Sequence, residues 1–219
     1  MDGRGNFCRF APAKQTRVVR VARIAKESDY DAVVATIVAA FRDDPTWAWM
    51  FPDPFKRPDQ HATVFGLYVE SALSNEGVWM ADDRASAVAV FTRPGERELS
   101  ESAEARLEPF LVEALGDHAP AVLTTFERFE AAIPQGRRPF YYLSFLGTRP
   151  DSRGKGIGMG LLAELVAEAD RDGQPTYLES TNPANNPRYE RLGFKAQSSF
   201  KTSDEVHTVT TMWRDPAVV

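Results

Sequence analysis

The sequence lacks several features that define large classes of proteins. Its 219 residues contain one cysteine, Cys8, so a framework of internal disulfides is excluded. No segment approaches the 18 or more consecutive apolar residues that a membrane-spanning helix needs. Basic residues are fewer than acidic ones, 26 against 31, which argues against a nucleic-acid-binding protein. The three histidines lie in distant segments without metal-ligand spacing, so no metal site is predicted.

The composition is that of an ordinary globular protein with a sizeable core, 43% hydrophobic and 26% charged. The first residues have neither hydrophobic periodicity nor the apolar run of a secretory signal. We therefore expect a disordered leader at residues 1–16 and a single domain at residues 17–219, in a cytoplasmic protein.

Hydrophobic periodicity predicts alternating strands and helices. Strands are expected at residues 18–25, 78–83, 86–94, 140–148, 175–181, 194–200 and 206–213. Helices are expected up to about residue 41, at 59–73, as a pair within 99–133 that breaks near Gly116, after a glycine-rich turn at 154–160, and at 186–193. Prolines and aromatic residues interrupt the pattern at 42–58. This order indicates a mixed α/β sheet with helices on both faces.

The segment TRPDSRGKGIGMGLLAEL, residues 148–165, runs from a strand through four alternating glycines into an apolar helix pattern. Such glycines let backbone N–H groups converge on an anion at the start of a helix. A Walker loop is excluded because Gly156, not serine or threonine, follows Lys155. The spacing of the glycines also fails the dinucleotide fingerprint. The turn is therefore expected to hold another phosphate-bearing ligand, with a ligand-free turn as the alternative.

Two motifs resemble those of the GCN5-related N-acetyltransferases, the GNAT superfamily. RGKGIG after LGTRPD resembles their acyl-CoA-binding motif, with Arg153, Gly156 and Gly158 at the defining positions. NPANNPRYERLGF resembles a second signature through Asn185 and Tyr189, followed by Gly-Phe. The resemblance covers about residues 18–214 and is closest to the puromycin N-acetyltransferase-like branch, through AAFRDDP, VWMADD, AVAVFTRP and YLESTNPANNPRYERLGF.

The resemblance implies the GNAT fold, an α/β (α+β) architecture. Its central sheet is mixed, mostly antiparallel and twisted, with about seven strands and a V-shaped splay between the fourth and fifth. Helices cover both faces, and residues 99–133 form a helical insertion. It further implies acetyl-CoA as co-substrate, no metal, and direct acetyl transfer to a primary amine of a small molecule, an aminonucleoside-type antibiotic among the candidates.

Two rival functions stay open. An acetyltransferase of peptide or protein N-termini would need an open groove instead of a pocket closed by the 99–133 helices. An acyl-CoA-binding regulator would lack turnover. No nucleic-acid or membrane partner is expected, and the oligomeric state, a homodimer included, is left open.

The resemblance also assigns residues to the acyl-CoA. Its pantetheine arm would pair with the main chain of Leu146, Gly147 and Thr148, as an added strand does. Asn185 would bind the cofactor or cap a helix. Gly147 could equally mark a bulge, and Lys155 a surface charge. The pyrophosphate would be held mainly by N–H groups of Arg153, Gly154, Lys155, Gly156, Ile157 and Gly158.

Direct attack of an amine on a thioester needs a base, an oxyanion donor and an acid. Tyr189 is expected to be the acid, and a backbone N–H near Leu146 the oxyanion donor. Glu179 is the candidate base, with a structural carboxylate as the alternative. The predicted acceptor-binding residues are Asp44, Trp47 and Phe145. The alternatives are a loop-capping role for Asp44, next to Asp43, and core or lid packing for Trp47, Trp49, Phe51 and Phe55.

Overall fold

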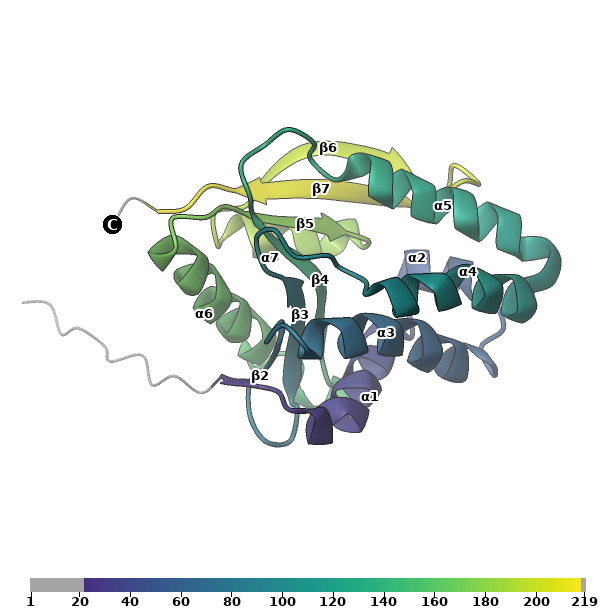
Figure 1. Ribbon diagram of the computed structural model, residues 1–219, viewed down its shortest axis with the longest axis horizontal. Helices are drawn as coiled ribbons and strands as arrows, with labels where there is room; N and C mark the ends of the chain where they lie inside the picture. The colour runs from purple at the N-terminus through teal and green to yellow at the C-terminus, as the bar shows by residue number, and fades with distance from the viewer. Residues whose placement is uncertain (1–21, 218–219) are drawn as a thin grey trace, which may run out of the picture.

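The computed structural model describes residues 22–217 as a seven-stranded sheet with helices on both faces (Figure 1). The sheet order is β1-β2-β3-β4-β5-β7-β6, and all neighbours are antiparallel except β4 and β5. This confirms the mixed, mostly antiparallel architecture. The predicted leader lies outside the described residues. The strands are β1 (Arg23–Ile24), β2 (Val78–Met80), β3 (Ala87–Thr92), β4 (Tyr141–Thr148), β5 (Thr176–Ser180), β6 (Lys195–Lys201) and β7 (Thr208–Arg214).

Strands β4 and β5 pair only at their beginnings, over Tyr141–Leu143 and Thr176–Leu178. Beyond Leu143 strand β4 continues to Thr148 with β3 on its other edge. The predicted splay between the fourth and fifth strands is thus confirmed. The β3–β4 register skips Ser144, because Val90 pairs with Phe145 and Phe91 with Leu143.

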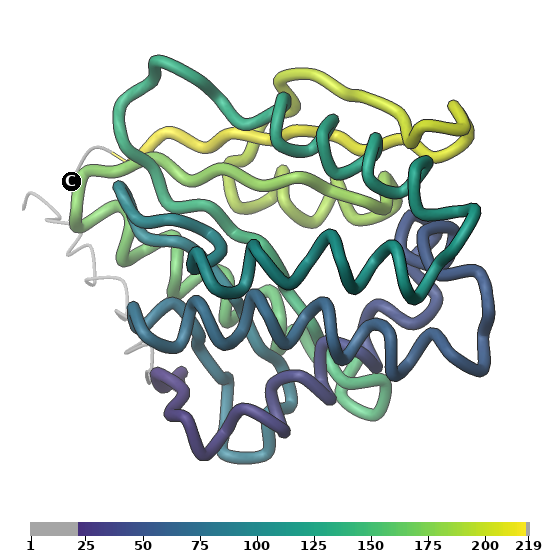
Figure 2. The backbone as a smooth tube through the Cα atoms, turned by 45° about the vertical axis from the view of Figure 1, so that its right-hand side comes forward, coloured from purple at the N-terminus to yellow at the C-terminus, as the bar shows by residue number. Residues whose placement is uncertain are grey.

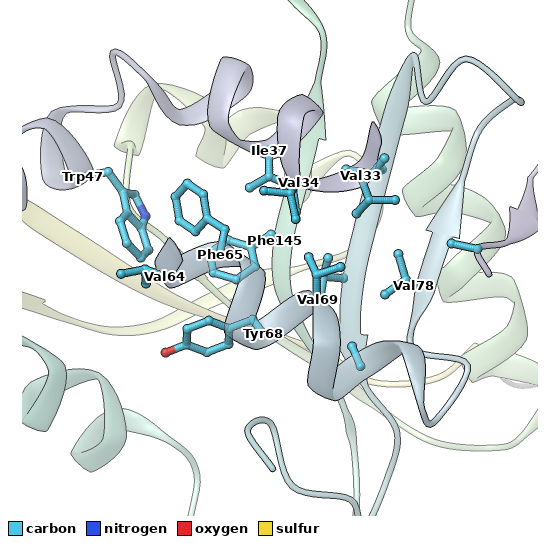
Figure 3. Packing of buried hydrophobic residues seen from close by; sticks show 14 of the residues in the cluster. Val33, Val34, Ile37, Trp47, Val64, Phe65, Tyr68, Val69, Val78 and Phe145 are labelled. Carbon is cyan, nitrogen blue, oxygen red and sulfur yellow. The ribbon is translucent and has the colours of Figure 1, made fainter. Parts of the chain in front are cut away.

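This bulge at Ser144 changes which side chains of β4 face each layer of helices. Before it, Tyr141 and Leu143 join the core cluster packed against α6 (Ile157–Arg171). After it, Phe145 joins the cluster packed against α1 (Tyr30–Phe41) and α3 (Arg57–Leu73), shown in Figure 3. A bulge adds one residue to a strand, so the alternation of side chains shifts by one. The strand therefore contributes to both cores.

The two remaining long helices form a hairpin, α4 (Glu101–Leu115) and α5 (Ala119–Ala132), in the predicted insertion and broken at Gly116. Helix α4 packs beside α3, and α5 reaches β6 (Figure 2). Helix α7 (Asn186–Glu190) lies on the α6 side, where Tyr189 packs against that core cluster. Short 3-10 turns occupy Glu27–Asp29, Gly116–His118, Pro150–Ser152 and Pro183–Asn185.

The segment at 42–58, predicted only as a break, contains the short helix α2 (Pro45–Met50). Asp44 is its N-cap and accepts the N–H groups of Thr46 at 3.1 Å and Trp47 at 3.2 Å. Pro45 at the first helical position lacks only an N–H that would have no partner there. Pro45 therefore begins α2, in a segment where the prolines had indicated only an interruption of helix.

Candidate active site

The divergence of β4 and β5 opens a cavity of about 640 Å³. Strands β4 and β5 form two of its walls, the glycine-rich turn and α7 form another side, and α2, α3 and α5 contribute aromatic side chains. Residues far apart in the sequence therefore share one space. Among those that line it are Phe41, Asp43, Asp44, Trp47, Tyr68, Glu98, Phe126, Phe129, Tyr142, Ser144, Phe145, Leu146, Thr148, Arg153, Gly154, Gly156, Ile157, Gly158, Glu179, Asn185, Arg188, Tyr189 and Arg191.

The turn between β4 and α6 exposes backbone donors to this cavity. Gly154 and Gly156 have φ angles of 77° and 74°, in the left-handed region that favours glycine. The first bond into the helix runs from the Gly160 N–H to the Gly156 carbonyl at 2.8 Å. Within residues 22–217 the N–H groups of 154 to 159 have no hydrogen-bond acceptor. Free donors at the positive end of a helix dipole form an anion-binding site.

The later glycines of the turn differ in what they require. A Cβ on Gly158 would overlap the Thr148 Oγ1, so the Thr148 side chain would have to turn or β4 and α6 would have to move apart. A Cβ on Gly160 would have no atom within 4 Å. Gly160 is therefore the one of the four that the described structure does not require.

The two predicted cations of the turn lie in different places. Arg153 lines the cavity and donates to the Ala40 carbonyl at 3.0 Å. Lys155 does not line the cavity, and its ammonium donates to the Asp151 carbonyl at 3.0 Å. Its side chain lies at the exposed surface, the position that the alternative role predicted.

The β4 residues assigned to the pantetheine arm lie beyond the last pair with β5. Leu146 and Thr148 line the cavity, but Gly147 does not. A Cβ on Gly147 would contact the Ala40 Cβ at 3.2 Å and the Ile37 Cα at 3.4 Å, so this glycine admits α1. Its alternative role as a bulge is wrong, because the bulge lies at Ser144. The edge of β4 that faces away from β3 is open to an extended ligand here.

Glu179 follows the last β4–β5 pair at the closed end of the splay. Its carboxylate accepts hydrogen bonds from the hydroxyls of Tyr142 and Tyr177, the latter at 2.8 Å. Burial raises the pKa of Glu179 to about 8, although both hydroxyls lower it; the charge of Glu98 adds to the rise. A carboxyl group that titrates near neutrality can accept a proton from a bound amine.

Glu98 lines the same cavity and was missed by sequence reasoning. Burial raises its pKa to about 7, and an interaction with the Ser144 hydroxyl lowers it. The Ser144 hydroxyl is buried and has no hydrogen-bond partner among the described residues. Glu98 lies in GERELS, between β3 and α4, where no motif or periodicity distinguishes it from neighbouring surface residues.

Tyr189 lies half-buried on α7, with its ring edge-on to Phe194 at 6.2 Å between centroids. Burial, and then the charge of Asp44, raises the pKa of Tyr189 to about 12. The phenol therefore stays protonated at neutral pH and can donate a hydrogen bond into the cavity. Asn185 occupies the N-cap position of α7 without a capping bond and accepts from Arg188 at 3.0 Å. Its predicted alternative as a side-chain cap is wrong.

Asp44 lines the cavity while capping α2. Besides the two N–H groups of α2, it accepts the Thr181 hydroxyl at 2.9 Å. Burial raises its pKa, against the lowering effect of these bonds. The capping role is therefore real, although at the start of a helix instead of in the C-capping loop that was expected.

Trp47 and Phe145 combine core packing with a surface in the cavity. Each is 5% exposed, and their ring centroids lie 5.9 Å apart beside Phe65 (Figure 3). The other aromatic residues considered do not line the cavity: Phe51 is buried elsewhere, Phe55 is 92% exposed, and Trp49 packs on His118.

The cavity thus offers an anion-binding turn, an open strand edge, a phenolic donor and two carboxyl groups that titrate near neutrality. Residues 22–217 contain no group of three His, Cys, Asp or Glu side chains arranged to hold a metal ion. No helix in this range is long and apolar enough to cross a membrane.

The model of the Acetyltransferase (GNAT) family matches residues 79–194, just over half of the chain. An uncharacterized N-acetyltransferase of Schizosaccharomyces pombe is 37% identical over 59 residues. That match spans 27% of this chain and only 24% of the relative's length.

Two solved structures are similar over nearly the whole chain. The histone acetyltransferase HPA2 and related acetyltransferase from Corynebacterium glutamicum is 26% identical, with a TM-score of 0.66 over 91% of this chain and 97% of that chain. Arylalkylamine N-acetyltransferase 2 from Aedes aegypti is 15% identical, with a TM-score of 0.63 over 90% of this chain and 98% of that chain. The second likeness shows the fold alone.

Proposed function

The chain belongs to the acetyltransferase (GNAT) family, and we propose that it transfers the acetyl group of acetyl-CoA to a primary amine of a small molecule. The observation that carries this proposal is the single cavity, which joins the anion-binding turn to the carboxyl groups of Glu98 and Glu179. A donor with phosphates and an acceptor with an ammonium group suit these two ends.

The residues of the turn fit a coenzyme A diphosphate. The N–H groups of residues 154 to 159 have no acceptor in the part of the chain that the structure describes, and Arg153 lies beside them at the cavity. Leu146 and Thr148 present the open edge of β4 to an extended arm. When bound, acetyl-CoA supplies an acetyl thioester as the electrophile. Asn185 and Tyr189 lie on the same cavity and would contact the arm near its reactive end.

The covered acceptor side supports a small molecule over a peptide. Phe126 and Phe129 of α5 line the cavity, so α5 covers this side of it. Helix α5 is fastened to the β6–β7 hairpin, since Arg128 donates to the Lys201 and Thr202 carbonyls at 2.8 and 2.9 Å. An extended peptide needs an open groove. The aminonucleoside-type acceptor and the puromycin-related branch stay predictions of the motif resemblance.

In the proposed reaction Glu179 acts as the base. A carboxylate Oε of Glu179 takes one proton of the ammonium group, which leaves a neutral amine able to attack. The second proton that the nitrogen loses on forming the amide balances the charge of the released CoA thiolate. With a pKa of about 8, this carboxyl group is closer in acidity to an alkylammonium, near 10.4, than an ordinary glutamate at about 4.3 is. Proton transfer is therefore less uphill than it would be to a solvated carboxylate.

Tyr189 acts at the leaving sulfur through its Oη. Because the pKa of Tyr189 is about 12 and that of an ordinary thiol is about 8.5, complete proton transfer to a thiolate is uphill by about 5 kcal/mol. Tyr189 therefore stabilises the departing thiolate mainly as a hydrogen-bond donor. The role predicted for Tyr189, that of an acid, is thereby narrowed to donating a hydrogen bond to the thiolate.

The test is to incubate the protein with acetyl-CoA and a panel of small and peptidic amines while measuring released thiol. We expect thiol release with small primary amines and little with peptides. Tight acetyl-CoA binding without turnover on any amine would overturn the enzyme in favour of a binding protein. Turnover confined to peptides would reject the small-molecule acceptor.

A further inference from the structure

Four carboxyl groups line this cavity, and none forms an ion pair within the described residues; Asp43 is exposed and Asp44 caps α2, which leaves Glu98 and Glu179. Within residues 22–217 the ion pairs of the chain involve neither Glu98 nor Glu179. Glu179 accepts hydrogen bonds from the hydroxyls of Tyr142 and Tyr177. Glu98 lies near the Ser144 hydroxyl, which has no hydrogen-bond partner among the described residues. A half-buried carboxyl group without a cationic partner shifts its pKa toward the neutral form, whereas a cation bound beside it favours the ionised form. A cationic ligand would therefore supply the charge that the protein does not.

The two carboxyl groups act as one cluster. The charge of Glu98 raises the pKa of Glu179, and both charges raise the pKa of Tyr68, Tyr142 and Tyr177. Four of these five groups, Tyr68, Glu98, Tyr142 and Glu179, line the same cavity. Glu98 reaches the cluster from the β3–α4 segment and Glu179 from β5, so the tertiary fold alone joins them.

The cations that line the cavity belong to other elements. Arg153 lies in the glycine-rich turn, and Arg188 and Arg191 lie at α7. Arg153 donates to the Ala40 carbonyl and Arg188 to the Asn185 side chain. Positive charge therefore belongs to the elements assigned to the donor, and the unpaired carboxyl groups remain for the acceptor.

Resting on the proposed amine acetylation, we propose that Glu98 is a specificity-determining residue that selects acceptors with a second cationic group, as in an α,ω-diamine. The nucleophilic ammonium loses its proton to Glu179, after which both are neutral. Glu98 still carries its charge and needs a cation that persists through the reaction. A second ammonium meets this need, and the aromatic rings of Tyr68 and Phe126 are further surfaces on which a cation is stabilised.

The experiment compares tetramethylenediamine with butylamine, which have the same carbon chain and differ by one ammonium group. The full-length protein is used to measure kcat/KM with acetyl-CoA, and Kd by calorimetry with saturating CoA. We expect a preference of tenfold or more for the diamine in both measurements, because a charge pair in a desolvated site outweighs a surface pair. Glu98→Gln should reduce this ratio to near one.

The matched control is Glu101→Gln, three residues further along the chain, whose side chain is 90% exposed. This variant should keep the wild-type ratio. Equal use of the two amines by the wild-type protein, or an unchanged ratio in Glu98→Gln, would overturn the selectivity. The wild-type ratio decides the matter even if Glu98→Gln does not fold. A binding preference without turnover would uphold the selectivity and reject the proposed transfer, whereas turnover without preference would do the reverse.

Discussion

The contact between Gly158 and Thr148 makes the glycine-rich turn open to a quantitative test. In Gly158→Ala the new Cβ would overlap the Thr148 Oγ1, whereas in Gly160→Ala it would meet nothing within 4 Å. Both residues lie in the first turn or so of α6, so the two variants differ mainly in this contact. They form a matched pair on one helix.

The expected stability changes have opposite signs. Replacing glycine by alanine within a helix gains about 0.5–1 kcal/mol, and Gly160→Ala should show this gain. Overpacking costs about 1–3 kcal/mol, which in Gly158→Ala offsets or exceeds the same gain. The free energies of unfolding should therefore differ by about 1–3 kcal/mol between the variants. Since Thr148 lines the cavity, its displacement should also weaken acetyl-CoA binding.

The assay is urea unfolding of both variants together with calorimetric titration of acetyl-CoA. Thr148→Ala removes the overlapping oxygen, so adding it to Gly158→Ala should recover stability beyond the sum of the single effects, as a double-mutant cycle measures. If Gly158→Ala matched Gly160→Ala in stability and in acetyl-CoA affinity, the reasoning about close packing at this turn would be wrong.

Three further outcomes are expected. The rate of acetyl transfer should rise with pH through an apparent pKa near 8, set by Glu179 with Glu98, Tyr68, Tyr142 and Tyr177 around it. Glu179→Gln should lower kcat by about 10²–10⁴ and abolish this rise with pH. If the rise persisted in the variant, the base would be another group. Because the pKa of Glu179 is raised on folding from 4.5 to about 8, its contribution to stability is complete below about pH 4.5 and is lost as the pH rises through 8, so urea unfolding of Glu179→Gln should lose this part of the pH dependence. Tyr189→Phe should reduce kcat by about tenfold or more, the value of a charge-assisted hydrogen bond. It should leave the midpoint of the pH profile and the Kd of acetyl-CoA unchanged. An unchanged kcat would show that Tyr189 takes no part in the reaction. Arg128→Ala, which loses the bonds from α5 to the Lys201 and Thr202 carbonyls, should raise the KM for the amine and leave acetyl-CoA affinity unchanged; equal effects on both ligands would contradict the assignment of α5 to the acceptor.

The glycine-rich end of the cavity, which we propose binds the donor, was largely readable from the sequence. Gly154 and Gly156 precede a helical pattern, and their positive φ angles follow from local backbone geometry that glycine alone favours. Tyr189 lies within a contiguous motif, so its element and its approximate place could be inferred together. These features depend on residues close in the chain, where spacing determines geometry.

Other assignments failed because they depended on neighbours distant in the chain. Gly147 lies in the predicted strand, yet its lack of a side chain serves contact with α1, which no local pattern indicates. The bulge at Ser144 decides which core Phe145 joins, and it becomes visible only in the pairing of β3 with β4. Helix α2 was missed because a proline that ends one helix can equally begin another.

The sequence by itself determined the glycine-rich turn, the order of the strands and the longer helices, and the family, because each is encoded in residues a few positions apart. Only the tertiary structure decided the acceptor side. Glu98 and Glu179 are 81 residues apart in the chain, and their charges interact because β5 and the β3–α4 segment meet at one cavity. Burial in that shared space, which no single segment carries, raises the pKa of both carboxyl groups.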